Sequence, residues 1–397
     1  MLANKIGRRA IVLGVEKSDL CKAGSVLRDG GNVAFPTETV YGLGANALDV
    51  NAVQEIFKKK GRPLTDPLIV HVLNGDAALE LVKARGSTKR IFKLLADSFW
   101  PGPLTMVLEA SEKVPSVVCA DSGFVGVRCP AHPVARDLLE ESRVPVAAPS
   151  ANRFGHVSPT SASHVLDDLG DQDIVVVDGG DITQGSCAVG IESTVLKVVD
   201  SSINCDEDAD SDRELILFRK GGVSEKAIRE VLDKAGFTRT KIVSPTKPDP
   251  EAEVPNEAPG QCVTHYAPDV DTWLLSGPTG LDIPAVDSVG KELYFFDETE
   301  GACFNLKACV LLDFGGSFKS LQPKLLAYRD LSDEGVVHLA AQRLFDALRW
   351  TESIDNAKHV LISDVSSMDN EHAPAVADRM FRAASGKVSK SYKVICK

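Results

Sequence analysis

The chain has 397 residues, of which 44% are apolar and 25% charged, so it has the composition of a folded globular protein and the length of two domains. Acidic residues outnumber basic ones by 56 to 44, which gives a net charge of −12. This balance excludes a long-range basic field that would attract RNA or DNA, and strong nucleic-acid binding is not expected.

Residues 1–31 predict a short strand and a helix closed by a glycine pair. Residues 32–73 then form the stretch around which the rest of the chain is organised. An apolar strand at 33–35 is broken by Pro36, and after a polar turn comes a helix that Asp49 or Asn51 can cap. Residues 68–73 are an apolar run typical of a buried strand, interrupted by His71.

The end of the central helix has more positive charge than a helix stop needs. Three lysines fill the last turn, Gly61 follows, and Pro63 stiffens the exit, which together stop a helix. Arg62 adds a fourth cation between the glycine and the proline. We interpret this surplus of charge after Lys60 as an anion-binding site.

Strands and helices alternate from residue 76 to residue 235. Apolar periodicity and turn residues predict helices at 76–84, 88–99, 133–141, 160–169 and 224–235, and strands at 104–108, 124–128, 144–148, 174–177, 193–199 and 215–218. The acidic stretch 200–214 interrupts this pattern as a solvated excursion.

The composition changes at residues 244–260, which contain five prolines, several acids and few apolar residues, as in an extended linker. Beyond it, strands are predicted at 272–275, 293–296, 309–313 and 359–363, and helices at 335–350 and 373–384. This alternation predicts a small parallel, doubly wound sheet.

The nine cysteines are an odd number, and none lies in a C-x-x-C pair. This argues against a disulfide framework or a zinc ribbon and for a reducing compartment, so the cytoplasm is expected. No apolar run is long enough to suggest a membrane span or a signal peptide.

Two pairs of polar residues could together hold a triphosphate. Lys60 supplies a mobile charge and Arg62 a rigid fork, while Ser150 and Asn152 add hydroxyl and amide donors after a buried strand. The alternative is that the first pair only decorates a helix end and the second only caps a turn, as such residues commonly do. Spacing alone favours this alternative.

Gly42 and Gly44 match part of the dinucleotide-binding fingerprint, but the match does not hold. Residues 36–40 separate the strand from the glycines, and the acid about 20 residues on, Asp66, precedes the next strand instead of ending it. A nicotinamide site is therefore rejected.

Two further residues could be structural or functional. His71 has a plain interpretation as a satisfied core histidine. Arg128 ends an apolar strand, and a buried arginine needs either an internal acid or a substrate carboxylate.

Taken together, several ordered motifs resemble the threonylcarbamoyl-AMP synthase family, in its long form with a YrdC-like domain and a C-terminal domain. They are FPTETVYGLGANA (35–47), KGRP and PLIVHV (60–72), WPGPLT (100–105), VGVRCPAHP (125–133), APSAN (148–152), SPT (158–160), VGIESTV (189–195) and HYAP (265–268).

The resemblance implies an α/β fold. Residues 8–237 would form the YrdC-like catalytic domain, a twisted open mixed sheet with helices. Residues 238–268 would be a Pro-rich linker that serves as a lid, and residues 269–397 a smaller Rossmann-like parallel α/β domain.

The resemblance also implies an activity. L-Threonine, bicarbonate and ATP, with Mg²⁺ on the phosphates and no protein ligand for it, would give threonylcarbamoyl-adenylate and pyrophosphate. The product would pass to the threonylcarbamoyl transferase machinery that modifies tRNA.

The site residues follow from the same resemblance. Lys60 and Arg62 would be catalytic. The ATP-binding set would be Lys60, Arg62, Asp66, Ser150, Asn152, Ser158, Arg219 and Tyr266, and the threonine-binding set would be Thr37, Thr39, His71, Arg128, Ala148 and Ser193, with Arg128 on the carboxylate.

Two departures from the family pattern concern ATP affinity. Asp66 stands where the family usually has Asn, and residues 262–264 replace a more basic run before HYAP.

Two other functions remain open at this point. One is a non-catalytic RNA-binding module that uses the same cleft. The other is carbamoyl transfer as in hydrogenase-maturation proteins, although this chain lacks their acylphosphatase and zinc-finger signatures.

Overall fold

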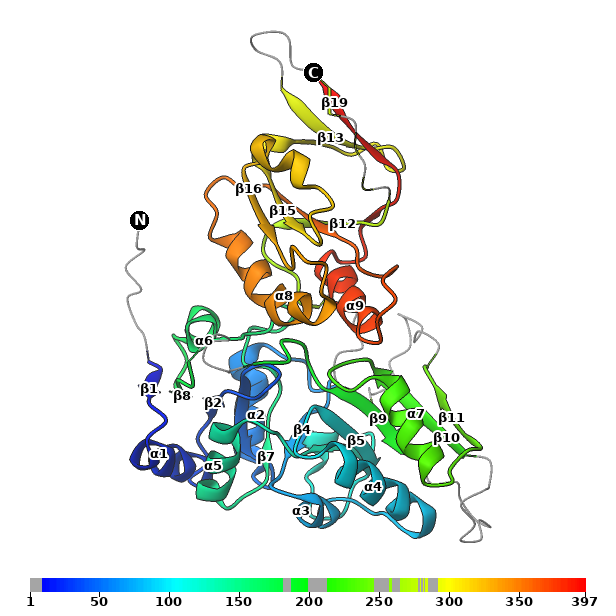
Figure 1. Ribbon diagram of the computed structural model, residues 1–397. Coiled ribbons are helices and arrows are strands. Elements are labelled where there is room, and N and C mark those ends of the chain that lie inside the picture. Colours follow the sequence, from blue (N-terminus) through cyan, green and yellow to red (C-terminus); the bar gives the residue numbers. More distant parts are fainter. Residues whose placement is uncertain are drawn as a thin grey trace. The chain divides into compact units, whose positions relative to one another are not determined.

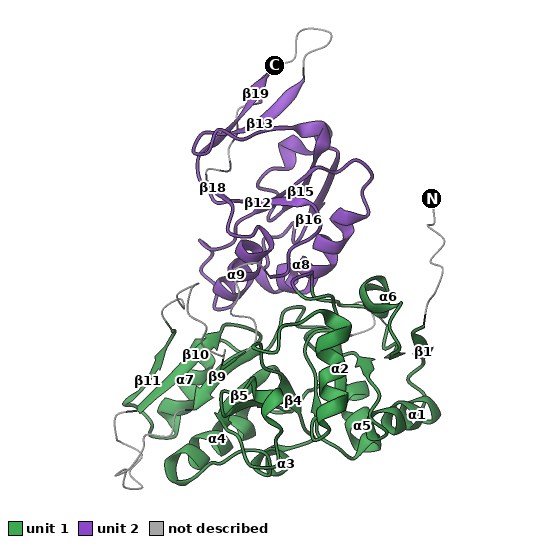
Figure 2. Cartoon of the chain, turned by 180° about the vertical axis from the view of Figure 1, so that it is seen from behind, with its two compact units in different colours: residues 1–154, 158–261 green, residues 155–157, 262–397 purple. Residues whose placement is uncertain are grey.

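The computed structural model describes residues 9–180, 187–198, 213–245, 257–258, 265–277, 279, 281, 283–284 and 292–397. Most of the predicted acidic excursion and of the linker lies outside these residues. The chain divides into two compact units, one made of residues 1–154 and 158–261 and the other of residues 155–157 and 262–397 (Figure 2).

The first unit contains a mixed sheet with the strand order β1-β8-β2-β3-β7-β4-β6-β5-β9-β10-β11 within the described residues (Figure 1). The strands are β1 (Ile11–Leu13), β2 (Val33–Phe35), β3 (Gly42–Asn46), β4 (Ile69–His71), β5 (Leu104–Glu109), β6 (Phe124–Arg128), β7 (Val146–Ala147), β8 (Val175–Val177), β9 (Thr194–Val198), β10 (Arg213–Arg219) and β11 (Thr240–Val243).

The helices of the first unit connect these strands. They are α1 (Lys17–Arg28), α2 (Val50–Lys60), α3 (Gly75–Leu79), α4 (Gly86–Phe99), α5 (Pro133–Ser142), α6 (Ala162–Leu169) and α7 (Glu225–Lys234), with a 3-10 turn η1 (Ser116–Cys119).

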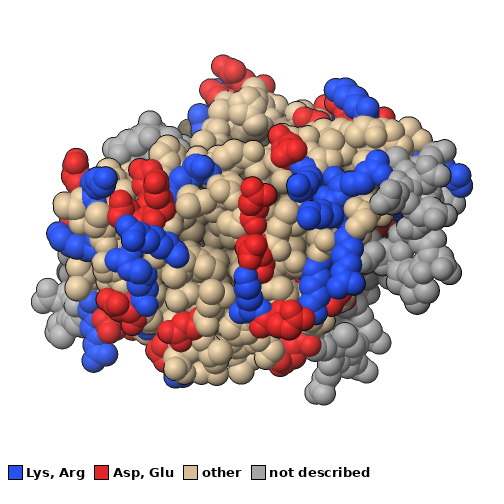
Figure 3. Space-filling model, turned by 90° about the horizontal axis from the view of Figure 1, so that it is seen from below, with Lys and Arg blue, Asp and Glu red and all other residues tan. Residues whose placement is uncertain are grey.

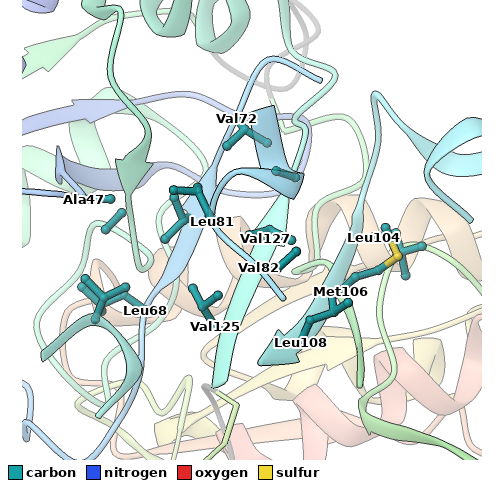
Figure 4. Packing of buried hydrophobic residues seen from close by; sticks show 14 of the residues in the cluster. Ala47, Leu68, Val72, Leu81, Val82, Leu104, Met106, Leu108, Val125 and Val127 are labelled. Atoms are coloured by element: carbon teal, nitrogen blue, oxygen red, sulfur yellow. The ribbon is translucent and has the colours of Figure 1, made fainter. Parts of the chain in front are cut away.

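Both faces of this sheet are covered. Val33 and Phe35 of β2 pack with residues of α1 and α5, whereas Ala34 between them belongs to the larger core that includes α2, α4 and α7. Successive strand residues point to opposite faces, so this alternation places helices on both. Figure 4 shows part of the larger core, where Met106 and Val127 from adjacent strands lie among its buried side chains.

The described residues of the second unit form two sheets. One is parallel, in the order β16-β15-β17-β12-β18, and the other is antiparallel, in the order β14-β13-β19. Their strands are β12 (Asp271–Leu275), β13 (Leu293–Asp297), β14 (Cys303–Asn305), β15 (Cys309–Asp313), β16 (Ala327–Asp330), β17 (His359–Ser363), β18 (Val388–Ser389) and β19 (Tyr392–Cys396). The helices are α8 (Val337–Glu352) and α9 (Ala373–Ala383), with 3-10 turns η3 (Leu306–Ala308) and η4 (Lys319–Lys324).

The predicted α/β class and the parallel C-terminal sheet are confirmed, with two corrections. Residues 42–46, predicted as part of a polar turn, form strand β3, which pairs antiparallel with β2. The predicted strand at 293–296 forms, but it belongs to the antiparallel sheet and not to the parallel one. In addition, no described helix is both long enough and apolar enough to span a membrane.

Candidate active site

The turn between β2 and β3 brings three distant segments together. Backbone N–H groups of Ala151, Cys187 and Val189 donate to the carbonyls of Tyr41, Thr37 and Glu38 at 2.8, 3.1 and 2.8 Å, and the N–H of Tyr41 donates to the Pro159 carbonyl at 2.9 Å. These bonds hold the segments around residues 151, 159 and 188 against one turn. Most of the predicted site residues lie on these segments or next to them.

Strands β4 and β6 add a second part of the site. They are parallel, with His71 in register with Arg128, and β7 pairs with β4 from the other side, with Val146 opposite His71. The N–H of Ala148 donates to the Ile69 carbonyl at 2.9 Å. The amino end of β4 therefore lies beside the start of the segment that leads to Ser150 and Asn152, whereas the carboxyl ends of β4 and β6 lie on the side of Val146.

Helix α2 positions the predicted catalytic lysine. Asp49 caps the helix by accepting from the N–H groups of Asn51 and Ala52, and Gly61 ends it in the left-handed conformation at φ 65°. The side chain of Lys60 turns inward: the residue is 4% exposed, and its Nζ donates to the carbonyls of Ser150, at 2.6 Å, and of Asn152. Lys60, Ser150 and Asn152 are thus brought together, and Lys60 is not a solvated cation at a helix end.

Arg62 and Asp66 form a buried ion pair at 2.9 Å. The Arg62 guanidinium also donates to the backbone carbonyls of Asp66, at 3.0 Å, and Pro67, at 2.8 Å. The carboxylate of Asp66 therefore lies on the predicted phosphate-binding arginine. This fixes the guanidinium and offsets part of its charge.

The structure answers the question that the sequence left open about Arg128. Its partner is an internal acid, Glu38, whose Oε1 accepts from the guanidinium at 2.7 Å. The guanidinium also donates to Thr39 Oγ1 at 3.1 Å, and Thr39 Oγ1 lies 2.8 Å from Thr37 Oγ1. Thr37, Thr39 and Arg128 therefore form one hydrogen-bonded group around Glu38, which sequence analysis missed.

His71 lies next to this group with an unusual environment for a core histidine. It is buried, it meets Phe35 edge to face at 6.0 Å, and among the described residues its Nδ1 has no hydrogen-bond partner. Burial, with the positive charge of Arg128, lowers its pKa to about 3. A buried polar atom of this kind can hydrogen-bond to a ligand or to an ordered water.

A third group of hydrogen bonds connects residues 192–193 with members of the predicted ATP-binding set and of the predicted threonine-binding set. Ser158 donates to Glu192 at 2.8 Å, and Ser193 Oγ lies 2.8 Å from Thr105 Oγ1. Arg219 donates from Nε to the Ser193 carbonyl at 3.0 Å and from its terminal nitrogen to Ser193 Oγ at 3.2 Å. Ser193 and Arg219, assigned to different substrates, are therefore in contact.

Tyr266 belongs to the second unit, so its predicted place beside the nucleotide stays a prediction. Its ring is buried, lies 5.2 Å from that of Phe345, and has the Arg379 guanidinium over it at 5.8 Å. The backbone of Tyr266 is left-handed, at φ 64°. Such a conformation is costly for a residue with a Cβ and is often found at functional positions.

One group of described residues has metal-ligand chemistry outside the predicted site. His156, Asp269 and Glu352, all in the second unit, have ligand atoms within 4.8 Å of one another. Glu352 Oε1 lies 2.8 Å from His156 Nε2 and accepts from the Asp269 N–H at 2.7 Å. The protein's own groups occupy this carboxylate oxygen, and we assign no metal to it.

Comparisons with known proteins identify the family. The family model described as "Telomere recombination", named for Sua5, YciO and YrdC, matches residues 25–205, and the model described as "Threonylcarbamoyl-AMP synthase, C-terminal domain" matches residues 223–385. A threonylcarbamoyl-AMP synthase of Bacillus subtilis is 32% identical over 377 residues, which cover 95% of this chain and 96% of the relative. The chain belongs to the threonylcarbamoyl-AMP synthase family.

Other members of the threonylcarbamoyl-AMP synthase family agree. The Pyrococcus abyssi synthase is 39% identical over 267 residues, covering 66% of this chain and 70% of the relative. A crystal structure of P. abyssi Sua5 complexed with L-threonine has a TM-score of 0.74 and 32% identity, and the match covers 96% of this chain and 99% of that one. The two-unit architecture is therefore that of the long members of the family.

Glu38, Glu192 and Thr105 are the residues that sequence analysis missed. All three lie inside quoted motifs, Glu38 in FPTETVYGLGANA, Glu192 in VGIESTV and Thr105 in WPGPLT. A buried arginine at residue 128 needs an acidic partner, and the acids inside the motifs were the candidates from which that partner could have been chosen. Thr105 offered no such signal.

Proposed function

We propose that this chain is an L-threonylcarbamoyladenylate synthase, a nucleotidyltransferase that converts L-threonine, bicarbonate and ATP to threonylcarbamoyl-AMP and pyrophosphate. The observation that supports it most is the buried Lys60 ammonium on the Ser150–Asn152 segment, in the same unit as the Arg128 group. Cations for a polyanion and a guanidinium for an amino acid's carboxylate are what this reaction requires. The names of the relatives support the same activity.

The phosphate end of the site would bind ATP and stabilise the charge that develops on it. Lys60 and Arg62 would be the catalytic cations, with Ser150 and Asn152 as neutral donors and Asp66 orienting Arg62. The amine of threonine would first be carboxylated by bicarbonate, with loss of water, to a carbamate. An oxygen of this carbamate would then attack the α-phosphorus in line with the leaving pyrophosphate. No protein nucleophile takes part, so the residues act by positioning and charge stabilisation.

The nucleotide would extend toward Ser158 and Arg219. Arg219 is attached to Ser193 by two hydrogen bonds, and Ser158 to Glu192 by one. Because Ser193 and Glu192 are neighbours in the chain, ATP binding at these residues would also order the edge of the threonine site. We include Tyr266 in the proposed nucleotide site on the strength of the HYAP motif alone.

L-Threonine would bind with its carboxylate on Arg128 and its other groups among Thr37, Thr39, His71, Ala148 and Ser193. His71 would act as a neutral hydrogen-bonding group, because burial keeps its pKa far below 7. Selection against serine would depend on the threonine methyl group, which is worth about 1–3 kcal/mol.

The donor set at the phosphate end fits a Mg²⁺ ion that the nucleotide itself brings. Of the three ionisable side chains there, two are cations, and the carboxylate of Asp66 lies on Arg62 at 2.9 Å. Such a set suits phosphates better than a bare metal, and Mg²⁺ usually keeps phosphate and water ligands at sites of this kind. When bound, Mg²⁺ would neutralise charge on the phosphates.

The product would pass to the threonylcarbamoyl transferase machinery for tRNA, and the enzyme would act in the cytoplasm. The described cysteines are all free thiols, which suits a reducing compartment.

An RNA-binding module is the less supported function. On the face seen in Figure 3, lysine and arginine side chains are interspersed with aspartate and glutamate, and the chain's net charge is −12.

The test is a turnover assay with ATP, L-threonine and labelled bicarbonate. We expect threonine-dependent release of pyrophosphate and incorporation of label into an adenylate. Pyrophosphate release that does not depend on threonine would refute the proposal. Tight, salt-sensitive RNA binding without turnover would favour the RNA-binding module instead.

A further inference from the structure

The Glu38–Arg128 ion pair is buried where the substrate's carboxylate is proposed to bind. The two side chains are 10% and 5% exposed, and Glu38 is held from both sides, since Oε1 accepts from Arg128 at 2.7 Å and Oε2 from the Ala131 N–H at 3.1 Å. Burial raises the pKa of Glu38, but the Arg128 guanidinium outweighs it and holds this pKa below its usual value. Glu38 is therefore a charged carboxylate.

Arg128 keeps donors for a second acceptor. A guanidinium has five N–H groups. The described residues that accept from them are the Gly102 carbonyl at 3.4 Å, Thr39 Oγ1 at 3.1 Å and Glu38 Oε1 at 2.7 Å. Two N–H groups are thus left for a ligand, and a substrate carboxylate that uses them would lie on the same guanidinium as Glu38.

The charges decide which ligand this arrangement accepts. The pair alone is neutral, so a simple carboxylate would add a net negative charge beside a buried acid, which is costly. A zwitterionic amino acid adds no net charge. Its ammonium is attached to the carbon next to the carboxylate, so it would lie within reach of Glu38.

We propose that Glu38 receives the amino group of the substrate and thereby selects an α-amino acid over a carboxylic acid without an amine. This inference rests on the proposed function, which places the threonine carboxylate on Arg128. Glu38 would be a specificity-determining residue, and the Glu38–Arg128 ion pair would stay in place beside a second, matching pair of charges.

Among the described titratable side chains around Glu38, only Glu38 and Arg128 carry a charge. The titratable side chains whose charges act on it or with it are Arg128, His71, His132, Cys129 and Cys187. Burial lowers the pKa of both histidines and raises that of both thiols, so these four favour their neutral forms. Arg128 and Glu38 are the charges that a ligand meets.

The experiment compares two ligands that differ by the amine, L-threonine and (R)-3-hydroxybutyrate, by titration calorimetry on the full chain. In E38Q the affinity for threonine should fall at least about 30-fold, because its ammonium loses its partner. The affinity for 3-hydroxybutyrate should rise at least about 10-fold, because the repelling acid is gone. E38D should keep the preference for threonine, and E80Q, at an exposed acid paired with Lys113, should match the wild type.

The outcomes separate the possibilities. A loss of affinity for both ligands in E38Q would mean that Glu38 only positions Arg128, and unchanged affinities would also overturn the inference. Failure of the wild type to bind threonine would instead refute the proposed function. If E38Q does not fold, the wild type decides at neutral pH, where both Glu38 and the ligand carboxylates are charged: it must bind L-threonine far more tightly than (R)-3-hydroxybutyrate, and similar affinities for the two overturn the inference.

Discussion

At the residue scale, the buried ammonium of Lys60 distinguishes this site from an ordinary helix end. Lys58, in the same last turn, is 70% exposed at its side chain and pairs with Glu55, whereas Lys60 is buried against two carbonyls. A lysine in that position has lost most of its hydration. It therefore attracts a phosphate more strongly than a solvated lysine does.

Replacing Lys60 should reduce turnover much more than binding of threonine. We expect Lys60→Ala to cost about 2–4 kcal/mol of transition-state stabilisation, as for loss of one preorganised donor, and Arg62→Ala a similar amount. The measurement is kcat/KM for pyrophosphate release. Lys58→Ala is the matched control and should be near wild type, and a near-normal rate for Lys60→Ala would contradict the phosphate assignment.

His71 should make stability depend on pH above the range in which carboxylates titrate. Its pKa is about 3 in the folded chain against about 6.5 unfolded, so as the pH falls through 6.5 only the unfolded state takes up the proton. The free energy of unfolding should therefore fall on acidification, by up to about 1.4 kcal/mol per pH unit.

Urea unfolding between about pH 6.5 and 5 measures this slope. His71→Gln should flatten it, because glutamine takes up no proton. An equal slope in the variant would show that His71 is not held neutral by the fold.

Sequence analysis singled out Lys60, Arg62, His71 and Arg128, but it did not find Glu38 as the partner of Arg128 or Thr105 as the partner of Ser193. Glu38 lies 90 residues from Arg128, and Thr105 lies 88 residues from Ser193. A residue's own charge or position after a strand signals a possible role. Its contact across the sheet depends on pairing that the local pattern does not determine.

At the element scale, helix α2 positions Lys60, one of the residues proposed to bind the ATP phosphates. Asp49→Ala removes the side chain that accepts from two N–H groups of the first turn, and it should cost about 1 kcal/mol of stability. Because the cap lies at the opposite end from Lys60, kcat/KM should change little. A large loss of activity without loss of stability would contradict this separation.

Gly221, just after β10, should tolerate no side chain. A Cβ there would lie 2.4 Å from the Glu192 carbonyl oxygen and 2.5 Å from the Ser193 carbon and the Thr194 nitrogen. Gly221→Ala should therefore move the segment that holds Ser158 and Arg219, and should weaken nucleotide binding at least tenfold. Gly75→Ala, where the nearest atom would be 3.9 Å away, is the control for a harmless alanine.

Most elements with a strong periodicity were predicted within a few residues, whereas β3 was not. Its sequence is Gly-Leu-Gly-Ala-Asn, and isolated glycines weaken a strand pattern. The structure explains Gly44: a Cβ there would lie 2.7 Å from Val146 Cγ1 and 2.9 Å from Phe35 Cε1. Close approach of neighbouring side chains requires this glycine, and the sequence alone does not show that approach.

At the scale of the whole molecule, each unit has its own core. Met106 is fully buried in the first unit and Leu311 in the second. Met106→Ala and Leu311→Ala should each cost about 2–5 kcal/mol in the unit that contains them. In calorimetry each variant should shift a different part of the unfolding trace, whereas one shared transition that shifts in both would show that the units unfold together.

The division into two units was visible in the change of composition at the linker, but one detail of it was not. Gly155–Val157 come from the middle of the first unit's sequence, yet they belong to the second. The Gly155 carbonyl accepts from the Ala267 N–H at 3.2 Å, His156 meets Glu352, and the Val157 carbonyl accepts from Arg349. No local pattern in three residues could indicate these partners.

These three residues lie in the connection from Asn152 to Ser158, so their anchoring has a consequence for shortened forms of the protein. A chain cut before residue 262 would still contain a complete set of proposed phosphate ligands, but it would lack Ala267, Arg349 and Glu352. The connection would then begin and end at residues proposed to contact the substrate, and it would lack these three contacts of residues 155–157. Truncation would thus remove Tyr266 from the proposed nucleotide site and would also release the contacts that hold residues 155–157.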